Sequence, residues 1–341
     1  MALVSPLRIA VIAPLAWRTP PVAYGPWELF ASLLTEGLVA AGHDVTLFAT
    51  GNSLTNARLS SVTGHGWEEG TVEPKVVECL HISSVFERAH DFDVIHNSFD
   101  FLPLTYSRLA DTPVVTTVHG FSSDAVVDVY AAYNDIGAYV AISDSNRHPR
   151  LNYAATIGHG IAARRAEDRT DTGEHLMYFA RIHPDKGTAD AIDIARQANR
   201  PLHIAGIVHD QDYFDAQVAP HINDSDVIFL GAVPASQRES TLAGAAALLH
   251  PIAFDEPFGF SVAEALCVGT PVIAYDRGSM RELIRHGTDG FIVDSPATAA
   301  RAVQWCDNLD RQEIGNAARR RFSVDQMVAR YVEVYRNVLA S

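Results

Sequence analysis

Short apolar runs alternate with helical patterns along this chain, and that alternation restricts its fold more than any other feature of the sequence. The first run covers residues 7–13, apolar side chains then recur at helical spacing from Trp27 to Val39, and a second strand-like run follows at 44–50. Strands that alternate with helices form parallel sheets covered by helices on both faces. The sequence therefore predicts a doubly wound α/β fold.

A second series of alternating elements follows the first. Further strand-like runs of the first series lie at 93–96, 113–119 and 138–143, whereas residues 51–80 lack clear periodicity. The polar segment 164–174 has the composition of a linker, and strand-like and helical patterns resume after it. Two similar series predict two Rossmann-like domains that face a central cleft. A last amphipathic helix, from about Val324 to Leu339, either packs on the second domain or crosses back to the first.

Composition argues against several classes of function. The formal net charge of −15 disfavours nucleic-acid and anionic-membrane partners, since either would favour a basic surface. The three cysteines lack the spacing of a metal site or a disulfide framework, which fits a reducing cytoplasm. Because the sequence shows neither a signal peptide nor an apolar run of membrane-span length, we expect a cytoplasmic protein without integral membrane contact. The oligomeric state stays open.

Two carboxylates, Glu256 and Glu264, stand eight positions apart in the segment FDEPFGFSVAEALCVGTPVIA, across a loop-to-helix junction. Pro257 keeps a helix from running through Glu256, and apolar residues at helical spacing predict a helix that starts near Gly259. A helix N-terminus offers free backbone N–H groups and the positive end of the helix dipole, which suit a diphosphate. The spacing therefore fits a ligand with a sugar at one end and a nucleotide at the other.

Lysine is rare in this chain, and one of the two lysines lies where a ligand is expected. Of 26 basic side chains only Lys75 and Lys186 are lysine. Lys186 and Arg181 lie in the segment ARIHPDKG, directly after a predicted strand and before a predicted helix, where open α/β sheets bind ligands. Two cations at this position can clamp a diphosphate. The alternative is that both are solvated loop cations.

The first half of the chain offers two further candidates. His119 ends a predicted strand, so its side chain is expected to project into the cleft; a purely structural histidine is the alternative. In the loop AYGPWE, Gly25 would allow a ligand to approach the backbone closely. The alternative for this loop is a simple helix start, with Pro26 in the first turn and Glu28 favoured by the helix dipole.

Several catalytic motifs are missing from the sequence. It shows no nucleophile elbow, no H-E-x-x-H zinc helix, no phosphate loop of the G-x-x-x-x-G-K-[ST] type and no G-x-G-x-x-G fingerprint. A glycoside hydrolase would place two carboxylates about 5 to 9.5 Å apart around one sugar bond, whereas a helix terminus separates the two glutamates here. Hydride transfer, ATP hydrolysis and glycoside hydrolysis are therefore disfavoured.

Most of the chain resembles a known family of enzymes. The segment EPFGFSVAEALCVGTPVIA resembles the E-x7-E signature of retaining glycosyltransferases with the GT-B fold, specifically family GT4 (glycosyltransferase group 1), and ARIHPDKG resembles the G-R-x-x-x-x-K-G segment of that family. The VHG at 118–120, the FLGAV at 229–233 and the closing FSVDQMVARYVEVYRNVL follow in the order usual for the family. The whole chain also resembles actinobacterial enzymes that decorate oligosaccharide antibiotics.

The resemblance implies that the second domain binds a nucleotide-sugar donor. Glu256 would contact hydroxyl groups of the sugar, and Glu264 would hold the ribose hydroxyls. Arg181 and Lys186 would neutralise the diphosphate as the glycosidic bond to it breaks. Further residues would shape the sugar and phosphate site or meet the base, largely through their backbone: Phe258, Gly259, Phe260 and Val233.

In the first domain the resemblance implies that His119 lies beside the donor sugar near the acceptor and that Gly25 approaches the phosphates. The family often has two glycines where this chain has Gly25 and Pro26, and proline lacks the N–H that a second glycine could offer, so we expect this contact to be reduced or shifted. The N-G-[VI]-D segment of the family appears here as GHGIA, so the roles of the family's asparagine and acidic residue are not expected to carry over. The implied domains are 1–160 and 161–322, with a helix at 323–341 that crosses back to the first domain.

The implied activity is metal-independent, retaining transfer of a sugar from an NDP-sugar to a soluble acceptor such as a secondary metabolite or an oligosaccharide. UDP is the first expectation for the nucleotide, with dTDP and GDP as alternatives. No metal or cofactor is expected, because fixed cations and helix N–H groups can stabilise the leaving diphosphate. Two other functions stay open: a nucleotide-sugar epimerase or hydrolase of the GT-B fold, and a non-catalytic nucleotide-sugar-binding protein.

Overall fold

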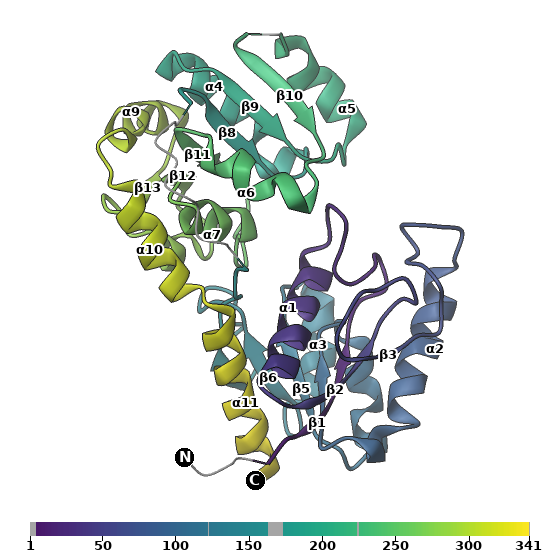
Figure 1. Cartoon of the computed structure of the whole chain (residues 1–341). Coiled ribbons are helices and arrows are strands. Elements are labelled where there is room, and N and C mark those ends of the chain that lie inside the picture. Colours follow the sequence, from purple (N-terminus) through teal and green to yellow (C-terminus); the bar gives the residue numbers. More distant parts are fainter. Residues whose placement is uncertain (1–4, 122, 163–172, 224, 341) are drawn as a thin grey trace. The chain divides into compact units, whose positions relative to one another are not determined.

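The computed structural model describes residues 5–121, 123–162, 173–223 and 225–340 (Figure 1). The chain folds into two compact units. Unit 1 comprises Met1–Gly160 together with Val324–Ser341, and unit 2 comprises Ile161–Ser323. The linker predicted at 164–174 lies almost entirely outside the described residues.

The sheet of unit 1 is parallel throughout, with the strand order β3-β2-β1-β4-β5-β6-β7. Its central strands are buried almost from end to end, as expected for a parallel sheet that is covered on both faces. The strands are β1 (Arg8–Ile12), β2 (Asp44–Phe48), β3 (Arg58–Ser60), β4 (Val94–Asn97), β5 (Val114–Val118), β6 (Ala138–Ala141) and β7 (Tyr153–Thr156).

Helices cover both faces of this sheet because successive side chains of a strand point to opposite faces. Ile95 of β4 packs in one core with Ile82 of α2, whereas the next residue, His96, faces Phe30 of α1, with 6.1 Å between their ring centroids. The helices of unit 1 are α1 (Pro26–Ala40), α2 (Pro74–Phe86), α3 (Asp124–Ala132), α11 (Val324–Ala340) and the short 3-10 helices η1 (Ala89–Asp91) and η2 (Leu102–Leu109).

Helix α2 begins inside the segment 51–80, where the sequence shows no clear periodicity. Pro74 occupies its first turn, a position that tolerates proline because its N–H would have no helical partner. Val77 and Val85 are buried, but Val76 and Leu80 on the other face are more than half exposed. Apolar residues on both faces remove the contrast on which a periodic pattern depends.

Helix α11 packs on α1 within unit 1 (Figure 1). A glycine on α1 permits this contact, since a Cβ atom at Gly37 would lie 2.4 Å from Cγ2 of Val328. Buried hydroxyl groups then fasten the helix to the sheet: Tyr331 Oη lies 2.8 Å from Thr117 Oγ1, and Tyr335 Oη lies 2.9 Å from His96 Nδ1. The last helix of the sequence is therefore part of the first unit.

Unit 2 repeats the same architecture with six parallel strands in the order β10-β9-β8-β11-β12-β13. The strands are β8 (Leu176–Phe179), β9 (Leu202–Ala205), β10 (Val227–Gly231), β11 (Ala247–His250), β12 (Val272–Tyr275) and β13 (Gly290–Val293). The helices are α4 (Thr188–Ala198), α5 (Gln211–Tyr213), α6 (Ala235–Ala243), α7 (Phe260–Cys267), α8 (Met280–Leu283), α9 (Pro296–Cys306) and α10 (Arg311–Arg321), with single turns η3 (Pro184–Lys186), η4 (Phe214–Val218) and η5 (Ala219–His221).

The predicted doubly wound α/β fold is confirmed in both units. In unit 2 one core joins Tyr178 of β8 to Ile192 of α4 and Val303 of α9, while α7 contacts β11 and β12 and pairs with α10. Within the described ranges, no helix combines the length and the apolar character that crossing a membrane requires.

Candidate functional site

The candidate site of unit 2 lies where the strand order of its sheet reverses direction. Strand β8 pairs with β9 on one side and with β11 on the other, and the chain leaves β8 toward β9 before it returns to β11. In open α/β sheets ligands bind beyond the carboxyl ends of the strands at such a switch point. The two loops that leave β8 and β11 there carry the predicted residues Arg181, Lys186 and Glu256.

The loop after β8 is held against the loop after β11. Gly187 has φ 71°, and a Cβ atom at this position would lie 1.9 Å from the carbonyl oxygen of Pro251, so only glycine fits without a backbone shift. The backbone N–H of Ala253 donates to the carbonyl oxygen of Asp185 at 2.8 Å. These contacts place Lys186 next to the chain segment that carries Glu256.

The loop that carries Glu256 is fixed from the other side by a turn before α8. Ser279 donates its backbone N–H to the carbonyl of Glu256 at 2.9 Å and its hydroxyl to the carbonyl of Phe258 at 2.6 Å. A Cβ atom at Gly278, whose φ is 54°, would lie 2.4 Å from both the backbone nitrogen and the carbonyl oxygen of Glu256. The backbone around Glu256 therefore has little freedom before any ligand binds.

Helix α7 starts directly after this loop. Gly259 precedes it with φ 94° in the left-handed region, and no side chain caps the helix N-terminus by a hydrogen bond. Phe258 is buried, its ring centroid lies 5.6 Å from that of Phe260, and a second contact at 6.3 Å joins it to Phe322 of the same unit. The helix start predicted near Gly259 is confirmed.

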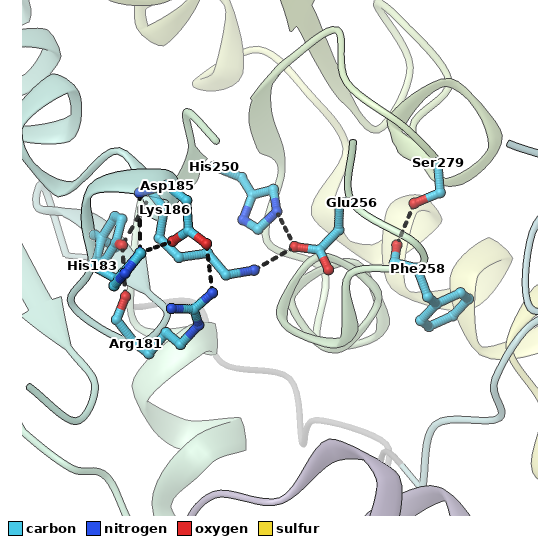
Figure 2. Close-up of polar contacts among 9 residues, drawn as sticks. Arg181, His183, Asp185, Lys186, His250, Glu256, Phe258 and Ser279 are labelled. Carbon is cyan, nitrogen blue, oxygen red and sulfur yellow. Dashed lines mark hydrogen bonds and ion pairs between the residues drawn. The ribbon is translucent and has the colours of Figure 1, made fainter. Parts of the chain in front are cut away.

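Lys186, His250 and Glu256 meet in a largely buried cluster (Figure 2). Lys186 Nζ lies 2.6 Å from Glu256 Oε2, and His250 Nε2 lies 3.6 Å from the same oxygen. The side chains of Lys186 and Glu256 are only 13% and 14% exposed. Burial by itself would raise the pKa of Glu256, but His250 and Lys186 outweigh burial and lower this pKa to about 2. Glu256 is therefore a carboxylate at neutral pH.

Arg181 is bound to a carboxylate of its own loop. Its guanidinium donates to Asp185 Oδ2 at 2.6 Å, and the other oxygen of Asp185 lies 2.6 Å from His183 Nδ1. The hydroxyl of Tyr178 donates to the carbonyl oxygens of Arg181 and Lys186 at 3.2 and 3.3 Å, which ties both cations to strand β8. Neither predicted cation is thus a solvated loop side chain in the described structure.

Glu264 forms a separate ion pair. Both of its oxygens accept from Arg238 of α6, at 3.2 Å from Nε and 2.5 Å from Nη2, and this guanidinium lies 4.7 Å from the ring centroid of Phe179. Helix α6 follows the loop that contains Val233, which is buried. The structure thus separates the two glutamates along α7: Glu256 lies before the helix, and Glu264 contacts α6.

The predicted residues of unit 1 lie directly before α1 and directly after β5. Gly25 precedes α1 with φ 146°, and Glu28 in the first turn is buried, accepts from the backbone N–H of Trp17 at 3.2 Å and has its pKa raised by burial to about 7. His119 stacks on Trp27 with 5.2 Å between ring centroids, and burial lowers its pKa to about 3. His119 is therefore a neutral histidine at physiological pH.

The sequence patterns did not single out His250, Asp185 or Arg238 of unit 2, and the reasons differ. His250 ends strand β11 and His119 directly follows β5, so the same strand-end argument could have found His250. Asp185 and Arg238 carry no comparable signal, because their partners are known only once the loops are folded. Within the described residues, no group of three or more His, Cys, Asp or Glu side chains could hold a metal ion.

The chain has the GT-B fold, in which each of two units contains a parallel Rossmann-like sheet. AviGT4, a glycosyltransferase involved in avilamycin A biosynthesis, superposes with a TM-score of 0.75 at 23% identity, over 98% of this chain and 99% of that chain. Anabaena HepE in complex with UDP-glucose gives a TM-score of 0.72 at 18% identity, over 97% of this chain and 100% of that one.

The unit that carries the glutamate and lysine cluster also matches a sequence family. Residues 161–321 match the family described as Glycosyl transferases group 1. The chain is also similar to glycogen synthase of Mycobacterium tuberculosis strain H37Rv, with 25% identity in an alignment 386 positions long that covers 94% of this chain and 91% of that protein.

Proposed function

We propose that this chain is a metal-independent, retaining glycosyltransferase of the GT4 type that moves a sugar from an NDP-sugar to a soluble acceptor in the cytoplasm. One observation carries the proposal: two cations and a carboxylate, Arg181, Lys186 and Glu256, come together from the loops after β8 and β11, beside the N-terminus of α7. A nucleotide sugar needs cations and N–H groups for its diphosphate and acceptors for its hydroxyl groups.

In the proposed donor complex the ion pairs of the two loops are exchanged. Lys186 and Arg181, which contact Glu256 and Asp185 in this structure, turn to the diphosphate oxygens. Glu256 then accepts hydrogen bonds from hydroxyl groups of the donor sugar, next to a backbone shaped by Phe258, Gly259 and Phe260. The exchange gives the diphosphate two cations but takes them from Glu256 and Asp185. Both carboxylates then need other hydrogen-bond donors, because an unpaired charge in a partly buried site is costly.

Glu264 is proposed to hold the ribose hydroxyls. Its two oxygens each have lone pairs beyond those that Arg238 occupies, so the bidentate pair orients the carboxylate without saturating it. The backbone near Val233 is proposed to meet the base. The separation between the two glutamates fits these roles, since Glu256 would contact the donor sugar and Glu264 the ribose.

In the proposed reaction, the bond between C1 of the sugar and the diphosphate oxygen breaks, and its electron pair stays with the leaving NDP. The acceptor hydroxyl oxygen bonds to C1 on the same face, which retains the configuration, and its proton goes to the leaving phosphate oxygen. Arg181 and Lys186 stabilise the charge that grows on the diphosphate, which is the role that a metal ion has in other transferases.

UDP is the first choice for the nucleotide, because a protein of the same fold is known in complex with UDP-glucose; dTDP and GDP are the alternatives. A secondary metabolite is the first choice of acceptor, since AviGT4 is involved in the biosynthesis of avilamycin A. For unit 1 we propose an acceptor-side role that includes His119 and Gly25.

The proposal is tested by incubating the protein with UDP-, dTDP- and GDP-sugars, with and without a panel of oligosaccharide and secondary-metabolite acceptors. We expect NDP release that depends on the acceptor and is unchanged by excess EDTA, because protein cations neutralise the diphosphate. A changed sugar without an acceptor would indicate an epimerase, acceptor-independent NDP release a hydrolase, and binding without turnover a non-catalytic protein. A strict requirement for a divalent ion would contradict the metal-free mechanism.

A further inference from the structure

His250 is a buried histidine whose contacts are incomplete. His250 ends strand β11 and is only 4% exposed. Its Nε2 atom has no hydrogen-bond partner among the described residues. Buried polar atoms almost always have a partner, so an atom of this kind requires an explanation. The polar group that Nε2 faces is Glu256, with Oε2 at 3.6 Å, a distance beyond a hydrogen bond (Figure 2).

Lys186 occupies the oxygen that His250 faces. Its Nζ atom lies 2.6 Å from Glu256 Oε2 and 4.4 Å from the ring centroid of Phe254. Both described contacts of the Glu256 carboxylate thus fall on Oε2, so Oε1 is the oxygen available to a ligand hydroxyl. If Lys186 turned to a diphosphate with no replacement, Oε2 would be left as an unpaired buried charge.

We propose that His250 is a positioning residue for glycosyl transfer: when Lys186 turns to the donor diphosphate, Nε2–H of His250 takes its place on Oε2 of Glu256 and keeps Oε1 directed at the donor sugar. This inference rests on the proposed function. The movement is small, since closing the gap from 3.6 Å to a normal hydrogen bond of about 2.9 Å needs a shift of less than 1 Å.

The environment of His250 suits a neutral donor. Burial lowers its pKa; the facing carboxylate of Glu256 acts in the opposite direction, and Lys186 adds to the lowering. A neutral imidazole carries one N–H group, and a carboxylate opposite Nε2 favours the tautomer with the proton on that atom. A neutral His250 can therefore donate to the Glu256 carboxylate without adding a second positive charge beside Lys186.

The test compares His250→Gln with His250→Phe and His250→Asn. Glutamine places an amide nitrogen close to the position of Nε2, whereas phenylalanine has no donor and the amide of asparagine is too short. Binding of UDP-, dTDP- and GDP-glucose, and of UDP, dTDP and GDP alone, is measured by calorimetry without an acceptor. The control is His175→Gln, because His175 precedes β8 and so lies at the amino ends of the strands, whereas the site lies at their carboxyl ends.

We expect His250→Phe and His250→Asn to weaken binding of the preferred NDP-glucose by about tenfold, which corresponds to about 1.4 kcal/mol, and to change binding of the matching NDP by less than about twofold. His250→Gln and His175→Gln should bind both ligands like the wild type. A purely structural histidine would give equal losses for NDP and NDP-glucose, or a glutamine variant as weak as asparagine, and either result would overturn the proposal.

The two proposals fail in different ways. If the wild-type protein binds neither the three NDP-glucoses nor any other UDP-, dTDP- or GDP-sugar, the proposed function fails, whatever the variants do. If the wild type binds one of them and the phenylalanine and asparagine variants bind it equally well, only the role of His250 fails. Should His250→Phe not fold, the comparison of glutamine with asparagine still decides the question, because both are polar and smaller than histidine.

Discussion

At the scale of single residues, the structure explains why one of the two lysines of this chain should matter for function and the other should not. Lys186 is 13% exposed and paired with Glu256, whereas Lys75 lies on α2 of unit 1. Lysine and arginine are exchanged readily on surfaces, but a compact ammonium group beside a buried carboxylate is not equivalent to the wider guanidinium. The position of Lys186 is therefore more constrained than its place in a loop suggests.

Replacing Lys186 by alanine should lower turnover by about 100-fold or more, because the substitution removes a cation from the proposed diphosphate site. Lys75→Ala, which removes the other lysine, should leave turnover unchanged. Steady-state kinetics with the identified donor and acceptor measure the difference, and circular dichroism confirms that both variants are folded. Equal effects of the two substitutions would remove the argument that Lys186 binds the diphosphate.

At the scale of elements, α11 shows how hydroxyl groups fasten a helix onto a sheet. Tyr335 Oη contacts His96 Nδ1 at 2.9 Å, while Thr117 Oγ1 lies 3.2 Å from His96 Nε2 and 2.8 Å from Tyr331 Oη. All four residues are buried. The network satisfies both nitrogens of a buried neutral histidine, which an apolar helix face alone could not do.

Removing one hydroxyl from this network should destabilise unit 1. We expect Tyr335→Phe to lower the free energy of unfolding by about 1–3 kcal/mol, because it leaves Nδ1 of His96 buried without a partner. Urea unfolding followed by circular dichroism provides the measurement, and Tyr106→Phe at a half-buried ring of the same unit is the control. A Tyr335→Phe variant as stable as the control would show that the hydrogen bond to His96 contributes nothing.

At the scale of the whole molecule, buried histidines should make the folded state sensitive to acid. Burial lowers the pKa values of His96 and His119 to about 3 and that of His81 to about 4. Between those values and the ordinary pKa near 6.5, the unfolded chain binds protons that the folded chain does not bind. The stability that these groups contribute is complete above pH 6.5 and is lost as the pH falls, by up to about 1.4 kcal/mol per group and pH unit.

The midpoint of thermal unfolding should therefore fall by several degrees between pH 7.5 and pH 5.5. Tryptophan fluorescence is a suitable measurement, since three of the four tryptophans lie in unit 1: Trp17, Trp27 and Trp67. His81→Gln should reduce the fall, because glutamine can keep a hydrogen bond to the carbonyl of Ala13, which His81 contacts at 2.9 Å, but does not titrate. A midpoint that does not change between pH 7.5 and pH 5.5 would contradict the lowered pKa values of these histidines.

Much of this molecule could be predicted from its sequence, because strand and helix patterns are local. The predicted strands around residues 7–13 and 113–119 correspond to β1 and β5, and the predicted helix after Gly259 is α7. The sequence pattern of the segment 51–80 does not reveal helix α2, because apolar residues such as Val76 and Leu80 lie on its exposed face. Local patterns thus fail where an element does not present one polar and one apolar face.

The two series of strands and helices, and the loops in which a ligand site belongs, follow from local sequence patterns, because apolar period, proline and glycine act over a few residues. Which charges meet depends on how distant segments pack. Lys186 and Glu256 are 70 positions apart and come into contact because β8 and β11 lie side by side where the strand order reverses. His250 and Glu256 belong to β11 and the loop after it, so the fold of this one loop, and not the pairing of β8 with β11, brings His250 Nε2 to 3.6 Å from Glu256 Oε2.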